Sequence, residues 1–234
     1  MSVNEGHRKR LDKKVNEYGL EMLEEHEQLE HILFMVIPRG NTNQIAHRLI
    51  DRYGSIGAVL NADPEELIKI EGVGYRTAQF LVALPSLLGI VERSLKKGKA
   101  PKMESLDEIV AFARTYFYGQ LTESAYIFCL NPARRLKAVS KISYIGSDGE
   151  AFMFPPKLVI KRAICDKASS VVVVHNHPCG IPKPSQSDIK MSHELKKAFD
   201  ATEIKFIDSV ILTDEGYFSL FCKGYLGFPK KKYE

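Results

Sequence analysis

The sequence is poor in cysteine and lacks both a long apolar run and an apolar N-terminal segment. Its four cysteines are widely spaced and form no C-x-x-C pair, which argues against a thiolate zinc site and against a disulfide framework. No run of about 18 apolar residues occurs, so no transmembrane helix is expected. The N-terminus has no apolar core of the kind found in signal peptides. Together these absences favour a cytoplasmic protein that has no membrane partner.

The composition is that of an ordinary folded protein. The chain has 234 residues, of which 44% are hydrophobic and 26% are charged, as in soluble globular domains. This length is enough for one large domain or two modest ones, each with its own core. A formal net charge of +4 permits contact with nucleic acid without requiring it.

Four consecutive valines at 171–174 predict a strand buried in the core of a sheet. Because strand side chains alternate between the two faces, His175 and His177 point the same way at the C-terminal end of this strand. Pro178 and Gly180 then end the strand. The two imidazoles are therefore expected close enough together to share one small cation.

Beyond this loop, Ser185-x-x-Asp188 opens a helical pattern that can return a carboxylate to the two imidazoles. A structural zinc site normally has four protein ligands, whereas two His and one Asp leave a position for water, as in catalytic sites. His175, His177 and Asp188 are therefore the candidate ligands of a Zn²⁺ cofactor. Taken alone, Ser185-x-x-Asp188 is also a capping box that serves only the start of the helix. Both interpretations stay open at this point.

The pattern of these residues resembles a known motif. H-x-H-P followed by S-x-x-D, with Ser185 placed eight residues after His177, resembles the JAMM (MPN+) metalloprotease motif. The fuller pattern His-Asn-His-Pro-x-Gly with Pro-Ser-x-x-Asp is similar to the bacterial RadC family, whose members carry helix-hairpin-helix segments ahead of a JAMM domain. The resemblance covers most of the chain after residue 28 and implies a zinc-dependent peptidase or isopeptidase with a link to DNA repair.

The expected fold class is α+β, because helices and strands are mixed along the second half of the chain. An N-terminal all-α helix-hairpin-helix domain should precede a JAMM/cytidine-deaminase-like mixed β-sheet domain flanked by helices. Besides the valine strand, the patterns predict strands at 124–130, 136–145, 205–212 and 217–220 and helices at 105–116, 157–167 and after Ser185. The expected divisions are a charged tail at 1–28, the helical domain at 29–95, a basic linker at 96–103, the metal-binding domain at 104–228 and a basic tail at 229–234.

The stretch around Gly72-Val-Gly74 resembles a helix-hairpin-helix motif. The glycines can turn the backbone tightly, and their N-H groups with the next helix start could hold a phosphate. Gly72, Gly74 and Arg76 are thus candidate contacts to the DNA backbone. Equally, a glycine hairpin can simply pack two helices together.

The resemblance also implies a catalytic Glu. Glu123 precedes the first expected strand of the second domain by one residue, and this place is similar to that of the JAMM glutamate. Glu123 is the candidate general base, with Glu150 and Asp208 as rivals. In this assignment Ser185 would donate a hydrogen bond to the developing oxyanion. Its hydroxyl should then face the reacting water rather than the N-H of Asp188.

The sequence also departs from the family pattern. Relatives usually show Gly-Thr after the second strand and a His after the residue that matches Asp208, whereas this chain has Tyr-Ile-Gly-Ser-Asp and Ser209. The departures put substrate choice in doubt more than metal binding.

Three classes of function remain. The first is a zinc-dependent hydrolase of a peptide or isopeptide bond. The second is a DNA-associated accessory protein with a non-catalytic metal domain. A zinc deaminase is disfavoured because His-x-Glu and Pro-Cys-x-x-Cys are both absent.

Overall fold

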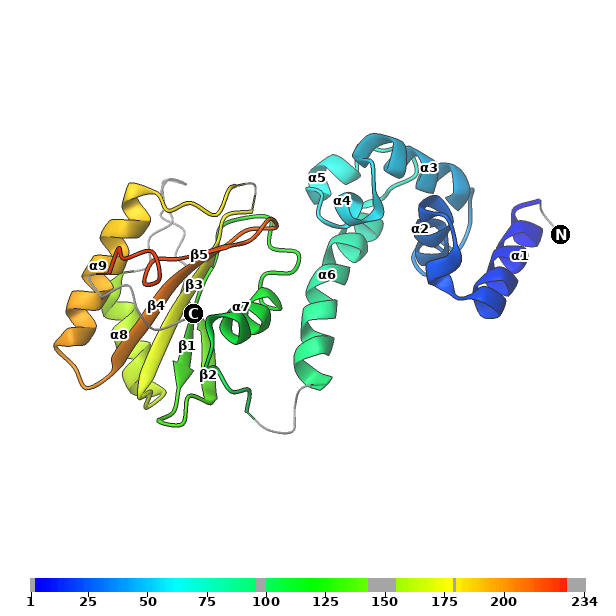
Figure 1. Ribbon diagram of the computed structural model, residues 1–234. Coiled ribbons are helices and arrows are strands. Elements are labelled where there is room, and N and C mark those ends of the chain that lie inside the picture. The colour runs from blue at the N-terminus through cyan, green and yellow to red at the C-terminus, as the bar shows by residue number, and fades with distance from the viewer. Residues whose placement is uncertain (1–2, 96–99, 143–154, 179, 227–234) are drawn as a thin grey trace. The chain divides into compact units, whose positions relative to one another are not determined.

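The computed structural model describes residues 3–95, 100–142, 155–178 and 180–226. By its internal contacts the chain divides into two compact units, Met1–Leu88 and Gly89–Glu234 (Figure 1). The first is helical, and the second is built on a mixed sheet with helices on its faces. The α+β fold expected from the sequence is therefore confirmed. Glu150 and the basic tail expected at 229–234 lie outside the described residues, as do residues 96–99 of the expected linker.

The first unit packs short helices around an aliphatic core. The helices are α1 (Val3–Tyr18), α2 (Glu25–Leu33), α3 (Thr42–Tyr53), α4 (Ile56–Leu60), α5 (Pro64–Leu67) and α6 (Tyr75–Leu95), with a 3₁₀ turn at Leu20–Met22. Asn41 caps α3 by accepting from the N-H of Gln44, and Asp63 caps α5 in the same manner. Leu33, Leu49 and Leu81 are fully buried in the shared core.

Helix α1 differs from the solvated tail expected for residues 1–28. Leu11 of this helix is buried, and Lys14 Nζ lies 2.7 Å from a carboxylate oxygen of Glu27 on α2. His7 Nε2 lies 3.1 Å from Oε2 of Glu30, a fully buried carboxylate. Because the charges of α1 have partners on α2, the helix packs against the unit instead of fraying. Sequence pattern alone does not show those partners.

The division between the two units falls inside helix α6, between Leu88 and Gly89, and not at the expected basic linker. The reason lies in its last two turns. The backbone of Gly89 approaches the carbonyl oxygen of Thr115 so closely that a Cβ would not fit, and the guanidinium of Arg93 lies 4.2 Å from the ring centre of Tyr116. Among the described helices, α6 alone has the length and mean hydropathy needed to cross a membrane. Of the residues in this apolar window, 22% are buried within the described structure.

The second unit contains a five-stranded sheet of order β2-β1-β3-β4-β5. The strands are β1 (Ala125–Leu130), β2 (Leu136–Lys141), β3 (Ser170–Asn176), β4 (Lys205–Leu212) and β5 (Tyr217–Ser219). Neighbours are antiparallel except β3 and β4, which run parallel. The connection between these two carries α9 (Gln186–Asp200), while α7 (Leu106–Arg114) and α8 (Pro156–Cys165) precede β1 and β3. The predicted valine strand is thus the central strand of the sheet.

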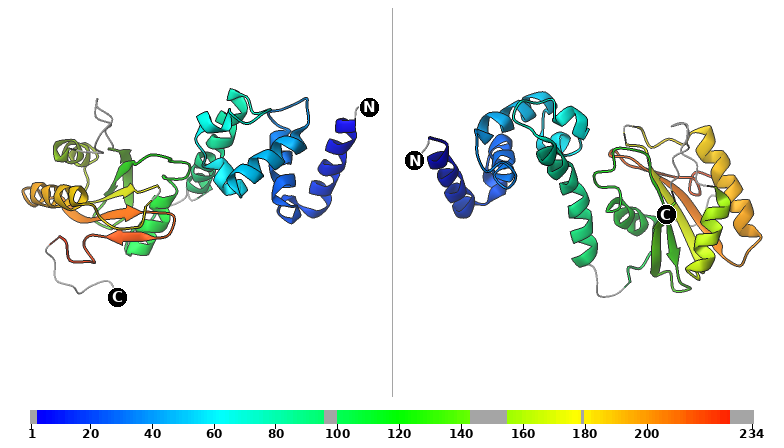
Figure 2. Two further views of the ribbon diagram at one scale, coloured as in Figure 1. Left: turned by 90° about the horizontal axis from the view of Figure 1, so that it is seen from above. Right: turned by 180° about the vertical axis from the view of Figure 1, so that it is seen from behind.

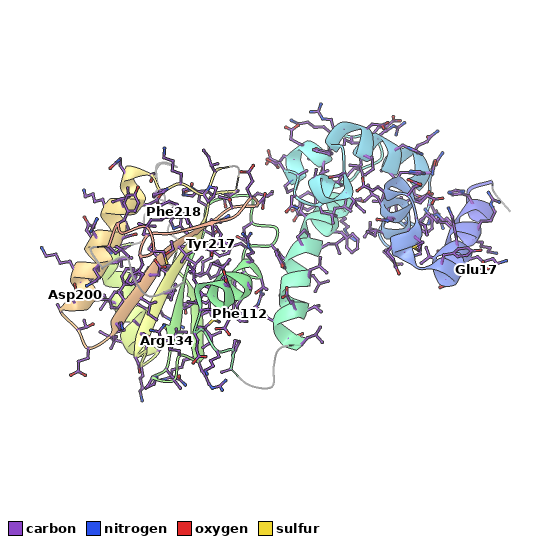
Figure 3. The ribbon with its side chains drawn as sticks, viewed as in Figure 1. Glu17, Phe112, Arg134, Asp200, Tyr217 and Phe218 are labelled. Carbon is purple, nitrogen blue, oxygen red and sulfur yellow. The ribbon has the colours of Figure 1, made fainter. Side chains whose placement is uncertain are left out.

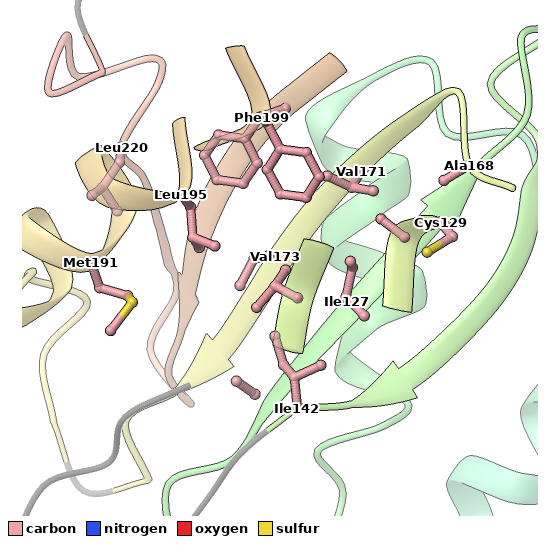
Figure 4. Close-up of a cluster of buried hydrophobic side chains, with 14 of the residues drawn as sticks. Ile127, Cys129, Ile142, Ala168, Val171, Val173, Met191, Leu195, Phe199 and Leu220 are labelled. Atoms are coloured by element: carbon pink, nitrogen blue, oxygen red, sulfur yellow. The ribbon is translucent and has the colours of Figure 1, made fainter. Parts of the chain in front are cut away.

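Helices cover both faces of this sheet (Figures 1 and 2). Val171 and Val173 pack on the side of α8 and α9, against residues such as Leu195 and Phe199 (Figure 4). Val172 and Val174 pack on the side of α7. Because every residue of β3 is buried, the strand reads as an unbroken apolar run up to its first histidine.

The edge strand β5 is tied to α7 by a polar contact. Tyr217, labelled in Figure 3, donates from its hydroxyl to a carboxylate oxygen of Asp107 on α7 at 3.1 Å. Arg114, on the last turn of α7, donates to the carbonyl oxygens of Thr213 and Gly216 in the β4–β5 turn. These contacts fasten the β4–β5 hairpin to α7.

Candidate metal centre

The candidate metal centre lies where β3 ends. His175 pairs with Ala125 of β1 on one side and Ile211 of β4 on the other, so its backbone is held by both neighbours. The N-H of His177 donates to the carbonyl oxygen of Leu212 at 2.8 Å, which continues the ladder one step beyond the strand. Both imidazoles therefore rest on the central part of the sheet.

The loop after His177 turns tightly. A Cβ placed on Gly180 would lie 3.2 Å from the Cβ of His177, closer than most Cβ contacts in proteins. Ser185 then caps α9, and Asp188 lies in its first turn. In this way the loop returns Asp188 to the end of the strand it left.

The three predicted ligands converge. The two Nε2 atoms of His175 and His177 lie 3.2 Å apart. Asp188 places Oδ1 3.2 Å from Nε2 of His175 and Oδ2 3.5 Å from Nε2 of His177. Tetrahedral zinc with bonds of about 2.0–2.1 Å holds its donors about 3.3–3.4 Å apart. The three side chains are of types that bind zinc, and one donor atom from each lies within 4.8 Å of the others, so they form a group able to hold a metal ion.

The charges of the site are coupled. Burial by itself would raise the pKa of Asp188, but hydrogen bonds from His175, His177 and Ser185 outweigh it and hold this pKa well below its usual range. The hydrogen bond to Asp188 in turn raises the pKa of His177, with a further contribution from the charge of Glu123. The site thus contains a carboxylate that stays ionised and attracts positive charge.

Glu123 lies beside the ligands. Its Oε1 is 4.0 Å from Nε2 of His177, and 45% of its side chain is exposed to solvent. The strand β1 that follows Glu123 pairs with β3, so the two ends that carry Glu123 and His177 meet at one edge of the sheet. The carboxylate is near enough to meet a molecule bound at the three ligands and open enough to exchange protons with water.

The rival Asp208 lies elsewhere. It pairs with Val172, well inside the sheet, and is only 4% exposed. It accepts hydrogen bonds from the hydroxyl of Ser219 at 2.5 Å and from the N-H of Phe221 at 3.0 Å. Burial raises the pKa of Asp208 to about 6 although these hydrogen bonds oppose the shift. Asp208 therefore belongs to a buried polar cluster under β5.

Ser185 is engaged as a helix cap. Its Oγ accepts from the N-H of Asp188 at 3.1 Å and donates to Oδ2 of the same residue at 2.7 Å. The N-H of Ser185 also donates to that oxygen, at 2.8 Å. Of the two orientations expected for this hydroxyl, the structure has the one directed at Asp188.

Sequence reasoning did not single out Asn176, the residue between the two histidines. Its Oδ1 accepts from the N-H of Ser124 at 2.7 Å, and its Nδ2 donates to the carbonyl oxygen of Thr122 at 3.3 Å. These two backbone groups flank Glu123. The place of Asn176 in the sequence, between two histidines at the end of a buried strand, could have indicated this role. A buried amide side chain needs both a hydrogen-bond donor and an acceptor nearby.

The hairpin of the helical unit has two different glycines. Gly72 has a φ of 92° and meets Ile45 so closely that a Cβ would lie 2.7 Å from its side chain, so packing and turn geometry both require glycine there. A Cβ on Gly74 would meet no described heavy atom within 4 Å. Arg76 follows in the first turn of α6 and is exposed. Contact of these residues with DNA remains a prediction.

Comparison of the sequence with known proteins finds a matching family and several relatives. A family profile described as RadC-like JAB domain matches residues 103–225. The chain is 28% identical to a UPF0758 protein of Fusobacterium nucleatum over 95% of this chain and 98% of the relative. It is 30% identical to a UPF0758 protein of Ruegeria pomeroyi, over 94% of this chain and 97% of the relative. It is 31% identical to a UPF0758 protein of Rhodobacter capsulatus, over 83% of this chain and 89% of the relative.

Proposed function

The chain belongs to the RadC family, and from this premise we propose that it is a zinc-dependent hydrolase of the JAMM type that cleaves a peptide or isopeptide bond. The single observation that supports the proposal most is the convergence of two imidazole nitrogens and one carboxylate within 3.2–3.5 Å, with a fourth acidic group 4.0 Å from one of them. A set of three protein ligands leaves a coordination position for a reacting molecule, as catalytic zinc sites require.

His175, His177 and Asp188 would hold the metal. When bound, zinc supplies a Lewis acid that polarises a carbonyl group and lowers the pKa of water to about 7. Asp188 contributes the negative charge that balances the cation, and its low pKa keeps that charge in place. His175 is only 1% exposed, so one side of the site is closed to solvent.

Glu123 would move the proton. Its carboxylate would take a proton from the attacking water and deliver it to the nitrogen of the leaving amine, because it lies 4.0 Å from Nε2 of His177 and is open to solvent. The exposure of Glu123 lets it return to the ionised form after each turnover. Ser185 could stabilise the oxyanion only after its hydroxyl releases Oδ2 of Asp188.

The proposal is tested with the purified full-length chain and an internally quenched peptide library supplemented with ε-glycyl-lysine isopeptides. We expect about one zinc per chain and zinc-dependent cleavage. Glu123→Gln should retain zinc and lose cleavage, whereas Glu194→Gln, a change at an exposed carboxylate on α9, should retain both zinc and cleavage. Stoichiometric zinc with unchanged cleavage in Glu123→Gln would remove the assigned base. Cleavage that is unaffected by chelators would refute the proposal.

A second function is favoured by one observation in the helical unit. Gly74 is open to solvent, so helix packing explains Gly72 but does not explain why Gly74 lacks a side chain. A glycine there lets a phosphate approach the N-terminus of α6, with Arg76 beside it. We propose that this hairpin binds the DNA backbone without reading its sequence.

Binding to a fluorescent duplex across a salt series tests this second proposal. Gly74→Ala should weaken binding without lowering the melting temperature of the protein. Arg76→Gln should reduce the slope of log K against log salt by about 1, while Arg52→Gln, an exposed arginine on α3, should not. Equal affinities for wild type and Gly74→Ala would contradict the assignment.

A further inference from the structure

The loop that carries Glu123 has little secondary structure to fix it. Residues 120–124 join the turns after α7 to β1 and lie outside any described helix or strand. Leu121 in this loop is 40% exposed and Glu123 is itself exposed. A general base must stay within hydrogen-bond reach of the proton it removes, so a loop of this kind needs an anchor.

Asn176 supplies contacts on both sides of Glu123. Its Oδ1 accepts from the N-H of Ser124 at 2.7 Å, and its Nδ2 donates to the carbonyl oxygen of Thr122 at 3.3 Å. Its own N-H donates to the carbonyl oxygen of Ser124 at 3.2 Å. The carboxamide therefore grips the backbone immediately before and immediately after the base.

The anchor itself is rigid. Asn176 is 5% exposed, is the last residue of β3 and pairs with Leu212 of β4. Its chain neighbours are the two histidines of the metal centre, which point to the other side of the strand. Ser124, the residue it grips, is 1% exposed and directs its hydroxyl to Oε1 of Gln120 at 3.3 Å. Strand β3 thus positions the candidate ligands and, through Asn176, also the backbone on either side of Glu123.

The amide is well matched to this task. The two backbone groups are a donor and an acceptor, and an Asn side chain offers one acceptor and one donor at a fixed separation. Asp would lose the donor, Gln is one methylene longer, and Ala would leave a buried N-H and a carbonyl without these partners.

We propose that Asn176 is the positioning residue of the site and holds Glu123 in register with the metal ligands. This inference rests on the proposed hydrolase function, because Glu123 is its general base. Asn176 touches no reacting atom and acts only through the backbone groups of Thr122 and Ser124, on either side of Glu123. Its removal should therefore slow turnover while leaving zinc binding and the affinity for substrate nearly unchanged.

The test uses full-length zinc-loaded protein and the quenched peptide library with ε-glycyl-lysine isopeptides. Asn176→Ala should lower kcat roughly 10- to 100-fold with KM within about twofold of wild type, because a small displacement of a catalytic group has effects of this size. Zinc affinity should fall by less than the about 10- to 100-fold expected when a hydrogen-bond partner of a metal ligand is lost, because the side chain of Asn176 bonds to Thr122 and Ser124 instead. Asn131→Ala is the matched control, since Asn131 also accepts a backbone N-H, that of Arg135, but at the β1–β2 turn. This control should leave kcat unchanged.

A double-mutant cycle shows whether Asn176 acts through Glu123. In the Glu123→Gln background, Asn176→Ala should cause no further loss of kcat, because the group it positions is already inactive. Independent losses that multiply would overturn the positioning role. So would a kcat in Asn176→Ala equal to that of Asn131→Ala.

Amide hydrogen exchange separates this inference from the hydrolase proposal. Loss of Asn176 should increase exchange across residues 121–124, whereas Asn131→Ala should not. Unchanged exchange in Asn176→Ala would overturn the positioning role even in an active enzyme. Increased exchange with no cleavage by any variant, wild type included, would instead show that the clamp exists and that the hydrolase proposal fails.

Discussion

Asp188 reaches back to His175 across the loop that follows β3, and its Oδ1 lies 3.2 Å from Nε2 of the imidazole. The same carboxylate receives the N-H and the hydroxyl of Ser185 on its other oxygen. One residue therefore serves the start of α9 and belongs to the candidate metal centre. The first two predictions follow from this double role.

Replacing Asp188 by Asn removes the negative charge of the side chain but keeps its size and shape. The amide can still accept from the N-H of Ser185, so we expect the free energy of unfolding of the apo protein to fall by no more than about 1 kcal/mol. Zinc affinity should fall at least about tenfold, because the anionic ligand is lost. Competition with a chromophoric chelator measures the affinity. Tight zinc binding by both Asp188→Asn and His175→Ala would place the metal elsewhere.

Replacing Ser185 by Ala tests its two roles against a matched serine. Ser105 forms the same capping box at α7, with Glu108 in place of the aspartate. Each Ser→Ala change should cost about 1 kcal/mol of stability, measured by urea unfolding. If Ser185 donates to the oxyanion, its replacement should also reduce kcat on the order of 100-fold, whereas Ser105→Ala should not. Equal kcat values in the two variants would show that Ser185 caps α9 and does not stabilise the oxyanion.

Zinc affinity should depend on pH through His177. Its pKa is raised chiefly by the hydrogen bond to Asp188, so the apo protein holds a proton there to a higher pH than an ordinary histidine does. Zinc requires the neutral imidazole, and affinity should therefore weaken as pH falls through this raised pKa, by up to about tenfold per pH unit for one competing proton. Titration calorimetry in buffers of different ionisation enthalpy measures the proton released. Affinity that does not change between about pH 5 and pH 8 would contradict the coupling.

The pKa of Asp208, raised to about 6 by burial, predicts a stability change with the opposite sign to that of an ordinary salt-bridged acid. A raised pKa in the folded state favours folding below the ordinary pKa of aspartate, and this contribution is lost as pH rises through about 6. Asp208→Asn should gain stability relative to wild type over that interval, on the order of 3 kcal/mol. Urea unfolding from about pH 4 to pH 8 measures it. A difference that is constant with pH, as expected for the exposed Asp214→Asn control, would show that Asp208 is not the group responsible.

Much of the metal domain could be predicted because its signals are local. The period-2 alternation of a strand places His175 and His177 on one face, and the capping pattern fixes where α9 begins. The valine run predicts a buried strand, and the expected helices flanking the sheet are found on both of its faces. The loop between strand and helix allowed Asp188 to return to the histidines, and the resemblance to the JAMM motif implied that it does.

What could not be predicted depends on partners that are distant in the chain. Helix α1 is held by pairs such as His7 with Glu30, which no local pattern joins. The last turns of α6 belong with the second unit because Arg93 meets Tyr116, and this contact moves the division away from the basic linker. The clamp of Asn176 was missed for the same reason, since Ser124 is brought to it only by the pairing of β1 with β3.

The central claim is that His175, His177 and Asp188 hold one zinc ion. X-ray absorption at the zinc edge of the zinc-loaded chain tests it most directly. The account predicts one zinc per chain with two imidazole nitrogens and oxygen donors at about 2.0–2.1 Å, and loss of this spectrum in His175→Ala. Sulfur scattering at about 2.3 Å, or an unchanged spectrum in His175→Ala, would contradict it.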